Sequence, residues 1–262
     1  MFRNYCLLVI SFFLTISAHA KEQYHWQERD FIINSFIDIA LQREYDRKQT
    51  PMLVRWERPI HIYVESDYGD SQLQAELLSI HARHLSKITG VPIYFTPNVK
   101  KANIIATFTD MDSVEDKVRR YIGPPDKIRT ALDEAICLGN FSINSKGQIQ
   151  SGVIIIPVDY ARQNARFLDC IVEEITQLMG LPNDSDDVYP SVFNDSSTDI
   201  YLSPLDFILL KALYSPRLSA GMSVDLVDQN LFKVIDDLYY SGVIDNAASL
   251  VQEGSLKSYL GD

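Results

Sequence analysis

A wholly apolar run that leads directly into a long amphipathic segment constrains the fold of this chain more than any other feature. Residues 153–156 are Val-Ile-Ile-Ile, which is typical of a strand buried on both faces of a sheet. Residues 159–180 then predict a helix that Asp159 caps and that Gly180 ends with a left-handed turn. The apolar stripe of this helix consists of Leu168, Ile171, Ile175 and Leu178. A buried strand followed by a helix that packs against it predicts an α/β fold.

The rest of the 262-residue chain alternates between strand and helix periodicity. Strand patterns precede the apolar run at 55–66, 91–97 and 102–110, and a turn at 145–147 predicts a hairpin whose second arm is that run. Helical patterns cover residues 26–46, 71–90, 203–218, 228–242 and, in part, 117–139. This order predicts a mixed α/β (α+β) sheet with a backing helix, followed by a smaller helical subdomain that begins near Gly180.

The N-terminus predicts an exported protein, either periplasmic or secreted. Residues 1–20 combine Arg3, an apolar run at 6–16 and a cleavage site at Ala18 and Ala20, which together are typical of a signal peptide. The alternative is a membrane anchor, for which the apolar run is too short, and we expect no anchor after cleavage. The predicted divisions are a signal peptide at 1–20, an N-terminal helical segment at 21–50, a main domain at 51–222 whose sheet part reaches about residue 180, and a C-terminal helical extension at 223–262.

The net charge limits the classes of binding partner, and the cysteine content predicts a disulfide. The chain has 24 Lys and Arg against 35 Asp and Glu, a net charge of −11. We therefore expect no binding to nucleic acid, because phosphates attract Lys and Arg. Cys137 and Cys170 remain after the predicted cleavage, and in an oxidising compartment such a pair predicts a disulfide. Two free, buried thiols are the alternative.

The helix that ends at Gly180 carries residues with the spacing of the zinc-protease pattern H-E-x-x-H-x-x-G-x-x-H. Glu173 stands at the first histidine position, Gln177 at the second and Asn183 at the third. Glu174 stands at the catalytic glutamate, and Gly180 matches the glycine. Residues four apart lie on one face of a helix, so the side chains at 173 and 177 are neighbours. The geometry of a metal site is present, but each histidine is replaced.

The replacements change the chemistry that the segment can support. Zinc in proteases prefers neutral imidazole ligands, whereas amide and carboxylate oxygens suit calcium or magnesium. Zinc is therefore disfavoured, and any cofactor is expected to be a divalent cation with oxygen ligands. The candidate ligands are Glu173, Gln177, Asn183 and Asp184. The alternative is that these residues form only the polar face of an amphipathic helix.

The surroundings of this helix resemble the zincin-type metallopeptidases, especially the metzincins. The resemblance rests on the stretches VRWERPIHIYVES, ANIIATFTD and EEITQLMGLPND, with DVYPSVF at the place of the methionine turn. It implies a first strand, a backing helix, two strands, an edge strand and an active-site helix ended by glycine. Glu174 and Gly180 match the zincin pattern, and the predicted main domain at 51–222 is then zincin-like.

The chain more closely resembles a bacterial family called domain of unknown function 2927. The matching stretches are CIVEEITQLMGLPNDSD, YPSVF and LSPLDFILLKALYSPRLSAGM, together with the upstream Cys137. The resemblance covers about residues 54–222, and the E-E-x-x-Q variant resembles the form usual in that family. No activity follows from this resemblance.

Histidines elsewhere offer one further metal-site hypothesis. His81 and His84 are three residues apart on the helix predicted at 71–90, a spacing that brings their side chains together. His84, however, falls on the apolar stripe of that helix, where a hydrogen-bonded core histidine is the commoner outcome. The chain has no G-x-S-x-G sequence and no phosphate-binding loop.

Three functions are compatible with these features. The first is a non-catalytic module of the cell envelope that binds an extended peptide or an envelope protein beside an edge strand. The second is a divergent metal-dependent hydrolase with Glu174 as general base. The third is a structural role, with calcium held by the loop that contains Asp184, Asp186 and Asp187. We rank them in this order.

Overall fold

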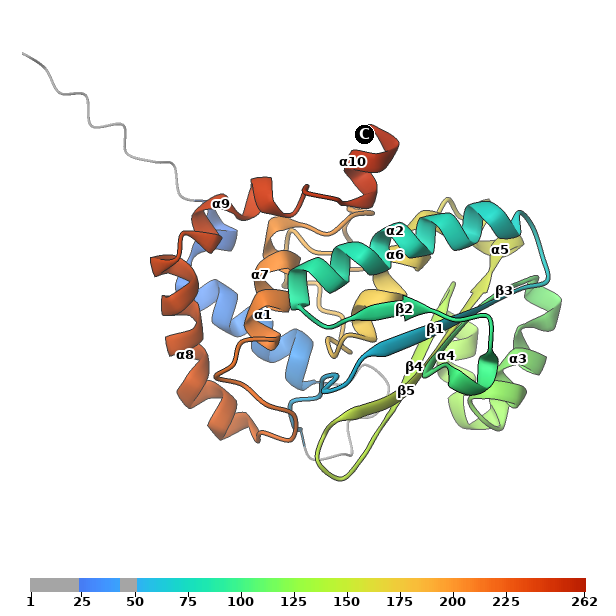
Figure 1. The fold of residues 1–262 in the computed structure, drawn as a ribbon, viewed down its shortest axis with the longest axis horizontal. Coiled ribbons are helices and arrows are strands. Elements are labelled where there is room, and N and C mark those ends of the chain that lie inside the picture. The colour runs from blue at the N-terminus through green and yellow to red at the C-terminus, as the bar shows by residue number, and fades with distance from the viewer. Residues whose placement is uncertain (1–23, 43–50) are drawn as a thin grey trace, which may run out of the picture.

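The computed structural model describes residues 24–42 and 51–262. The predicted signal peptide, with Ala18 and Ala20, lies outside these described residues. The described helices and strands are α1 (Arg29–Leu41), β1 (Ile60–Ser66), α2 (Ser71–Thr89), β2 (Ile93–Phe95), β3 (Ile104–Thr109), α3 (Val114–Tyr121), α4 (Arg129–Glu134), β4 (Leu138–Ile143), β5 (Ile149–Pro157), α5 (Val158–Gln163), α6 (Phe167–Gln177), α7 (Pro204–Leu213), α8 (Val224–Tyr240), α9 (Val243–Leu250) and α10 (Leu256–Leu260) (Figure 1). None of the described helices is both long enough and apolar enough to cross a membrane.

The described strands form one mixed sheet in the order β2-β1-β3-β5-β4. β2, β1, β3 and β5 are parallel, whereas β4 is antiparallel to β5 and lies at one edge of the sheet. β4 and β5 are the two arms of the predicted hairpin, and Gly147 occupies its turn with a φ of +71°. The predicted mixed α/β fold is therefore confirmed.

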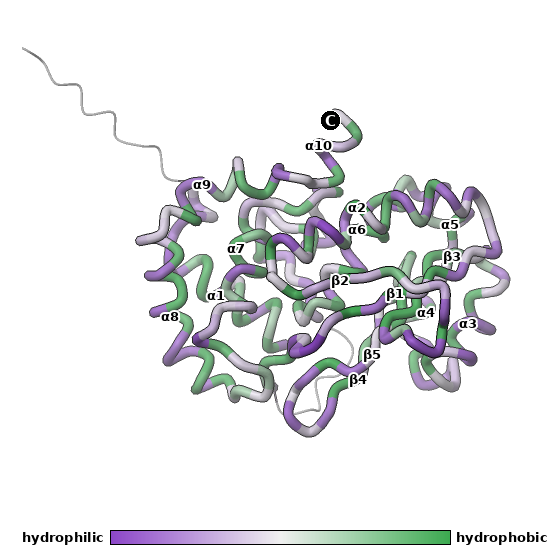
Figure 2. The backbone as a smooth tube through the Cα atoms, viewed as in Figure 1, coloured by the Kyte–Doolittle hydropathy of each residue, from purple (hydrophilic) through white to green (hydrophobic). Residues whose placement is uncertain are grey.

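Neighbouring side chains of β5 enter two different apolar clusters. Ile154 and Ile156 lie in the main core with residues of α2 and α6, whereas Ile155 lies in a smaller cluster with Val114 and Val118 of α3. Because side chains alternate across a strand, α2 and α6 cover one face of the sheet and α3 covers the other face near β5. In Figure 2, hydrophobic and hydrophilic residues alternate along α2, as expected for a helix with one buried face.

The helices α1, α7, α8 and α9 pack against one another beside the sheet, on the left in Figure 1. Their buried side chains belong to the same main core as the sheet, which extends from Ile32 in α1 to Leu256 in α10. α7 begins at the start of the helical pattern that the sequence shows at 203–218. Ser203 caps it, Pro204 lies in its first turn, and Asp206 completes a capping box.

The prediction of one continuous helix at 159–180 is wrong, because the structure has α5, a break and then α6. Asp159 lies inside the first turn of α5 and not at its cap, and its Oδ1 accepts a hydrogen bond from the Met111 backbone N–H at 3.0 Å. Ala165 adopts a φ of +57°, which a right-handed helix does not accommodate. Residues 163–166 contain no Gly or Pro, so the sequence carries no ordinary signal of this break.

Candidate functional site

A cleft of about 1090 Å³ lies along β4. Its walls are β4 itself, the preceding segment 122–136 with α4, and α6 with the residues that follow it. Four of the candidate catalytic and metal-binding residues line this cleft: Glu173, Glu174, Gln177 and Asp184. The cleft is therefore the place where the fold brings most of the predicted site together.

β4 is an edge strand, so one of its two sides is turned away from the sheet. Gly152 of β5 donates its N–H to the Asn103 carbonyl oxygen at 2.8 Å, which shows that Gly152 faces β3. Its partner on β4, Phe141, therefore belongs to a non-hydrogen-bonded pair. Because the pattern repeats every two residues, Gly139 also directs its N–H and C=O away from β5 and toward the outer edge.

The absence of a side chain at Gly139 brings β4 close to α6. A Cβ atom at this position would lie 2.4 Å from Oε2 of Glu174 and 3.0 Å from Cδ1 of Leu178. Any larger residue would therefore displace the Glu174 carboxyl group from the strand. Glu174, the candidate general base, is only 4% exposed and lies between α6 and the edge strand β4.

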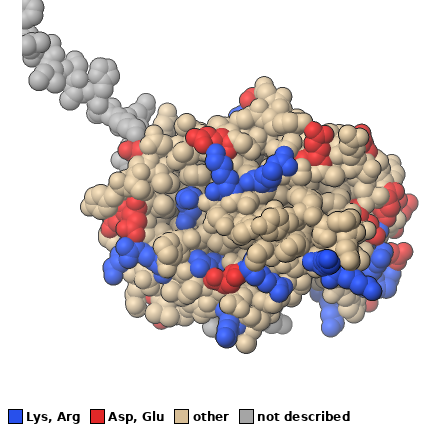
Figure 3. Space-filling view, viewed as in Figure 1, with Lys and Arg blue, Asp and Glu red and all other residues tan. Residues whose placement is uncertain are grey.

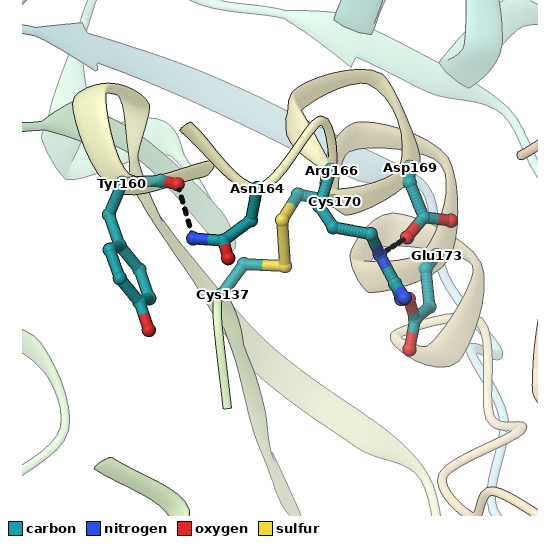
Figure 4. Close-up of a disulfide and its surroundings, with 7 residues drawn as sticks. All are labelled: Cys137, Tyr160, Asn164, Arg166, Asp169, Cys170 and Glu173. Carbon is teal, nitrogen blue, oxygen red and sulfur yellow. Dashed lines mark hydrogen bonds and ion pairs between the residues drawn. A yellow bond between two sulfur atoms is a disulfide. The ribbon is translucent and has the colours of Figure 1, made fainter. Parts of the chain in front are cut away.

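The predicted disulfide joins two walls of the cleft. Cys137, directly before β4, is bonded to Cys170 in α6, with their Cα atoms 5.9 Å apart (Figure 4). Cys170 lies one turn before Glu173 and Glu174 on α6. The bridge therefore holds the helix that carries the candidate site against the start of the edge strand.

Glu173 lies in a crowded group of charged side chains. Its carboxylate is 3.4 Å from the Arg166 guanidinium, which also forms an ion pair with Asp169 (Figure 4). Burial, together with the nearby acidic groups of Glu174, Asp184 and Asp169, raises the pKa of Glu173 to about 10, against a smaller opposing effect of Arg166. The site therefore disfavours an additional negative charge and is suited to a positive one.

Two of the candidate ligands are engaged with other groups. Gln177 donates from Nε2 to both carboxylate oxygens of Asp184, at 3.0 and 3.2 Å. Asn183 donates to the backbone carbonyl oxygens of Asp38 in α1 and of Asp184, at 3.1 and 2.9 Å. Asn183 is thus directed toward α1 and does not line the cleft. The structure brings Glu173 and Asp184 together and leaves Asn183 apart from them.

Asp195 completes a cluster of three acidic side chains, and the sequence analysis did not identify it as a member. Ligand oxygens of Glu173, Asp184 and Asp195 all lie within 4.8 Å of one another. Asp195 follows the turn at Ser191–Asn194 and lies far beyond the spacing of the zinc pattern, so no local periodicity pointed to it. Among the described residues, this is the one group of three or more potential metal-binding side chains, and Asp186 and Asp187 do not belong to it.

The donor set of the cleft does not fit zinc. No histidine is among the described residues that line it, and Cys137 is bonded in the disulfide. His81 and His84 are buried behind α6, where His81 Nε2 lies 3.0 Å from Thr176 Oγ1. Burial and the neighbouring His84 lower the pKa of His81 to about 3, which is typical of a neutral core imidazole. Carboxylate oxygens are suited to harder cations.

Two features fix the loop that carries Asp184 and Asp195. Gly180 adopts a φ of +113°, and a Cβ there would lie 2.2 Å from the Val54 carbonyl oxygen. At the other end, buried Asp206 accepts hydrogen bonds from Ser191 Oγ, Val192 N and Ser203 N, at 2.6, 3.2 and 2.7 Å. Burial raises the pKa of Asp206 to about 6 against these hydrogen bonds. The positions of Asp184 and Asp195 in the cleft thus depend on contacts outside it.

A family model described as "Protein of unknown function (DUF2927)" matches residues 29–233. This match spans more than half of the chain, and the chain belongs to this family. No curated protein matches the sequence.

Proposed function

We propose that this protein is an exported, zincin-like protein whose cleft binds an extended peptide as an added strand on β4, without cleaving it. One observation carries the proposal. An edge strand whose alternate backbone groups point outward forms a wall of a cleft of about 1090 Å³. Extended peptides bind to such edges through main-chain hydrogen bonds, and adjacent pockets select their side chains.

The order of the elements supports the zincin-like part of the proposal. β1 is followed by α2, two parallel strands, the antiparallel edge strand β4 and its partner β5, and then α6 with the turn at Gly180. The replacement of the zinc ligands supports binding without catalysis, because Gln177 contacts Asp184 and Asn183 contacts α1. The Cys137–Cys170 disulfide supports export, since such bonds persist in oxidising compartments.

The test uses a fluorescein-labelled peptide, Thr-Val-Thr-Lys-Thr-Val-Thr, and two versions methylated on alternate backbone nitrogens in opposite registers. An added strand donates only every second N–H to β4, so one methylated version should lose binding and the other should retain it. Binding is measured by fluorescence anisotropy, and cleavage by mass spectrometry. Equal binding of both methylated versions, or absence of binding by all three peptides, would refute strand addition.

A divergent hydrolase is the second candidate, because the oxygens of Glu173, Asp184 and Asp195 converge beside Glu174. Its test is metal content after dialysis against equimolar zinc, calcium, magnesium and manganese, followed by an assay for peptide cleavage. One bound ion, lost in Glu173→Ala, together with cleavage that Glu174→Gln abolishes, would make the hydrolase the better assignment. Neither result is expected from the binding function.

A further inference from the structure

The charge of the cleft differs from that of the surface around the sheet. On the face shown in Figure 3, Lys and Arg are interspersed with Asp and Glu. Among the described residues that line the cleft, in contrast, the acidic ones outnumber the basic ones. The acidic lining residues are Glu134, Glu173, Glu174, Asp184 and Asp195, and the basic ones are Lys127 and Arg166. A ligand that enters the cleft therefore meets a surplus of carboxyl groups.

The Arg166 side chain, which lies beside the cluster of acidic residues, already interacts with more than one of them. Arg166 forms an ion pair with Asp169 and lies 3.4 Å from Glu173, and it is also attracted by Asp195. One guanidinium group thus faces several carboxylates, as Figure 4 shows for Asp169 and Glu173. A second positive charge would offset part of the negative charge of Asp184 and Asp195 and would favour the ionised form of Glu173.

The pleat of β4 determines which side chains of an added strand would meet these carboxylates. Leu138 lies in the apolar cluster with α3 and α4, whereas Gly139 faces Glu174 of α6 and Leu178, which directly follows α6. A strand paired with β4 continues the same alternation, so every second ligand side chain lies on the α6 face. On that face Glu174 and Leu178 fill the space over Gly139, so a ligand side chain lies beyond the edge of β4, in the cleft that Glu173, Asp184 and Asp195 line.

We infer that the cleft recognises an extended segment that carries Lys or Arg at a position facing α6, where the carboxylates of Asp184 and Asp195, beside the carboxyl group of Glu173, receive the positive charge. The inference rests on the proposed function, because it assumes strand addition to β4. It identifies the ligand class as a basic, extended peptide and excludes acidic ones.

The experiment varies only the central residue of the labelled peptide Thr-Val-Thr-X-Thr-Val-Thr. X is Lys, norleucine or Glu, so the Lys and norleucine peptides have similar length and differ in charge. A charge-assisted contact predicts that the Lys peptide binds about tenfold or more tightly than the norleucine peptide. The Glu peptide should bind more weakly than both, and added salt should reduce the preference for Lys.

Matched variants of the protein show which side chains cause the preference for the Lys peptide. Asp184→Asn and Asp195→Asn each remove one charge while retaining side-chain size, and each should reduce the Lys preference several-fold. Asp228→Asn is the control, because Asp228 is exposed on α8, which does not line the cleft. A fall in Lys preference that is equal in all three variants would contradict the assignment.

The possible outcomes separate this inference from the proposed function. If the three peptides bind equally and still show the register dependence on backbone methylation, strand addition holds and the preference for a positive charge is refuted. If no peptide binds, both are refuted. If calcium binds stoichiometrically and the protein does not bind the Lys peptide more tightly than the norleucine peptide, the carboxylates form a metal site and the inference is wrong.

Discussion

The substitution His84→Leu should make the protein less sensitive to mild acid. His84 is only 2% exposed, and burial together with the nearby charge of Lys87 lowers its pKa from 6.5 to about 4, against a smaller opposing effect of the Val251 carbonyl. Because the pKa in the folded protein is below that in the unfolded chain, the unfolded chain takes up a proton first as the pH falls. The stability that the neutral imidazole contributes is present above pH 6.5 and is lost as the pH falls toward 4.

The size of this loss follows from the two pKa values. With a pKa of 6.5 in the unfolded chain and about 4 in the folded protein, lowering the pH from 7 to 5 costs about 2 kcal/mol of the free energy of unfolding. Leucine has no such titration. The difference in stability between the wild type and His84→Leu should therefore shift by about 2 kcal/mol in favour of the variant between these pH values.

The measurement is urea unfolding of both proteins at pH 7 and pH 5. The comparison between proteins is essential because Glu173 and Asp206 have raised pKa values, so their contribution to stability grows as the pH falls. These groups are present in both proteins, and their effects cancel in the difference. A stability difference that is the same at both pH values would refute the reasoning.

Three further predictions concern contacts that shape the cleft. Gly180→Ala should destabilise the protein by about 3 kcal/mol, because it adds strain at a positive φ and a clash with Val54. Gly90 also has a positive φ but has open space around it, so Gly90→Ala should cost only about 1 kcal/mol. Thermal unfolding of both variants checks this difference. Replacing both Cys137 and Cys170 by Ser should remove about 4 kcal/mol of stability in urea, since a separation of 33 residues becomes unconstrained, and an unchanged midpoint would contradict it. Asp206→Ala should cost about 3 kcal/mol in the same assay, because the donors of Ser191, Val192 and Ser203 lose their acceptor; a loss below that of a surface substitution would show that the contacts are dispensable.

Local patterns in the sequence were enough to predict most of the fold. The alternation in β1 leaves Ile60 and Ile62 buried, and Gly90 ends α2 in the left-handed conformation with a φ of +76°. These signals are reliable because they depend on neighbours within one element. Leu73, in contrast, lies one turn before buried Leu77 on the same face and is itself 38% exposed, because it belongs to the first turn of α2.

The candidate site was harder to predict, because its members meet through tertiary contacts. Spacing along one helix identified Glu173, and the adjacent loop identified Asp184, but nothing local to the zinc pattern pointed to Asp195. The direction of Asn183 toward α1 depends on a hydrogen bond to Asp38, far away in the sequence. Periodicity indicates which face of an element a residue occupies, but it does not indicate what that face meets.

The disulfide also determines how the cleft can open. It closes a covalent ring from Cys137 to Cys170 that contains the hairpin, α5 and the start of α6, so β4 and α6 cannot separate at that end. The segment 122–136 forms another wall and is held by side-chain contacts, including the apolar cluster around Ala131 and an ion pair of 2.8 Å between Arg129 and Glu115. Widening of the cleft for a bulky ligand would therefore have to displace this wall, and not separate β4 from α6 at the disulfide.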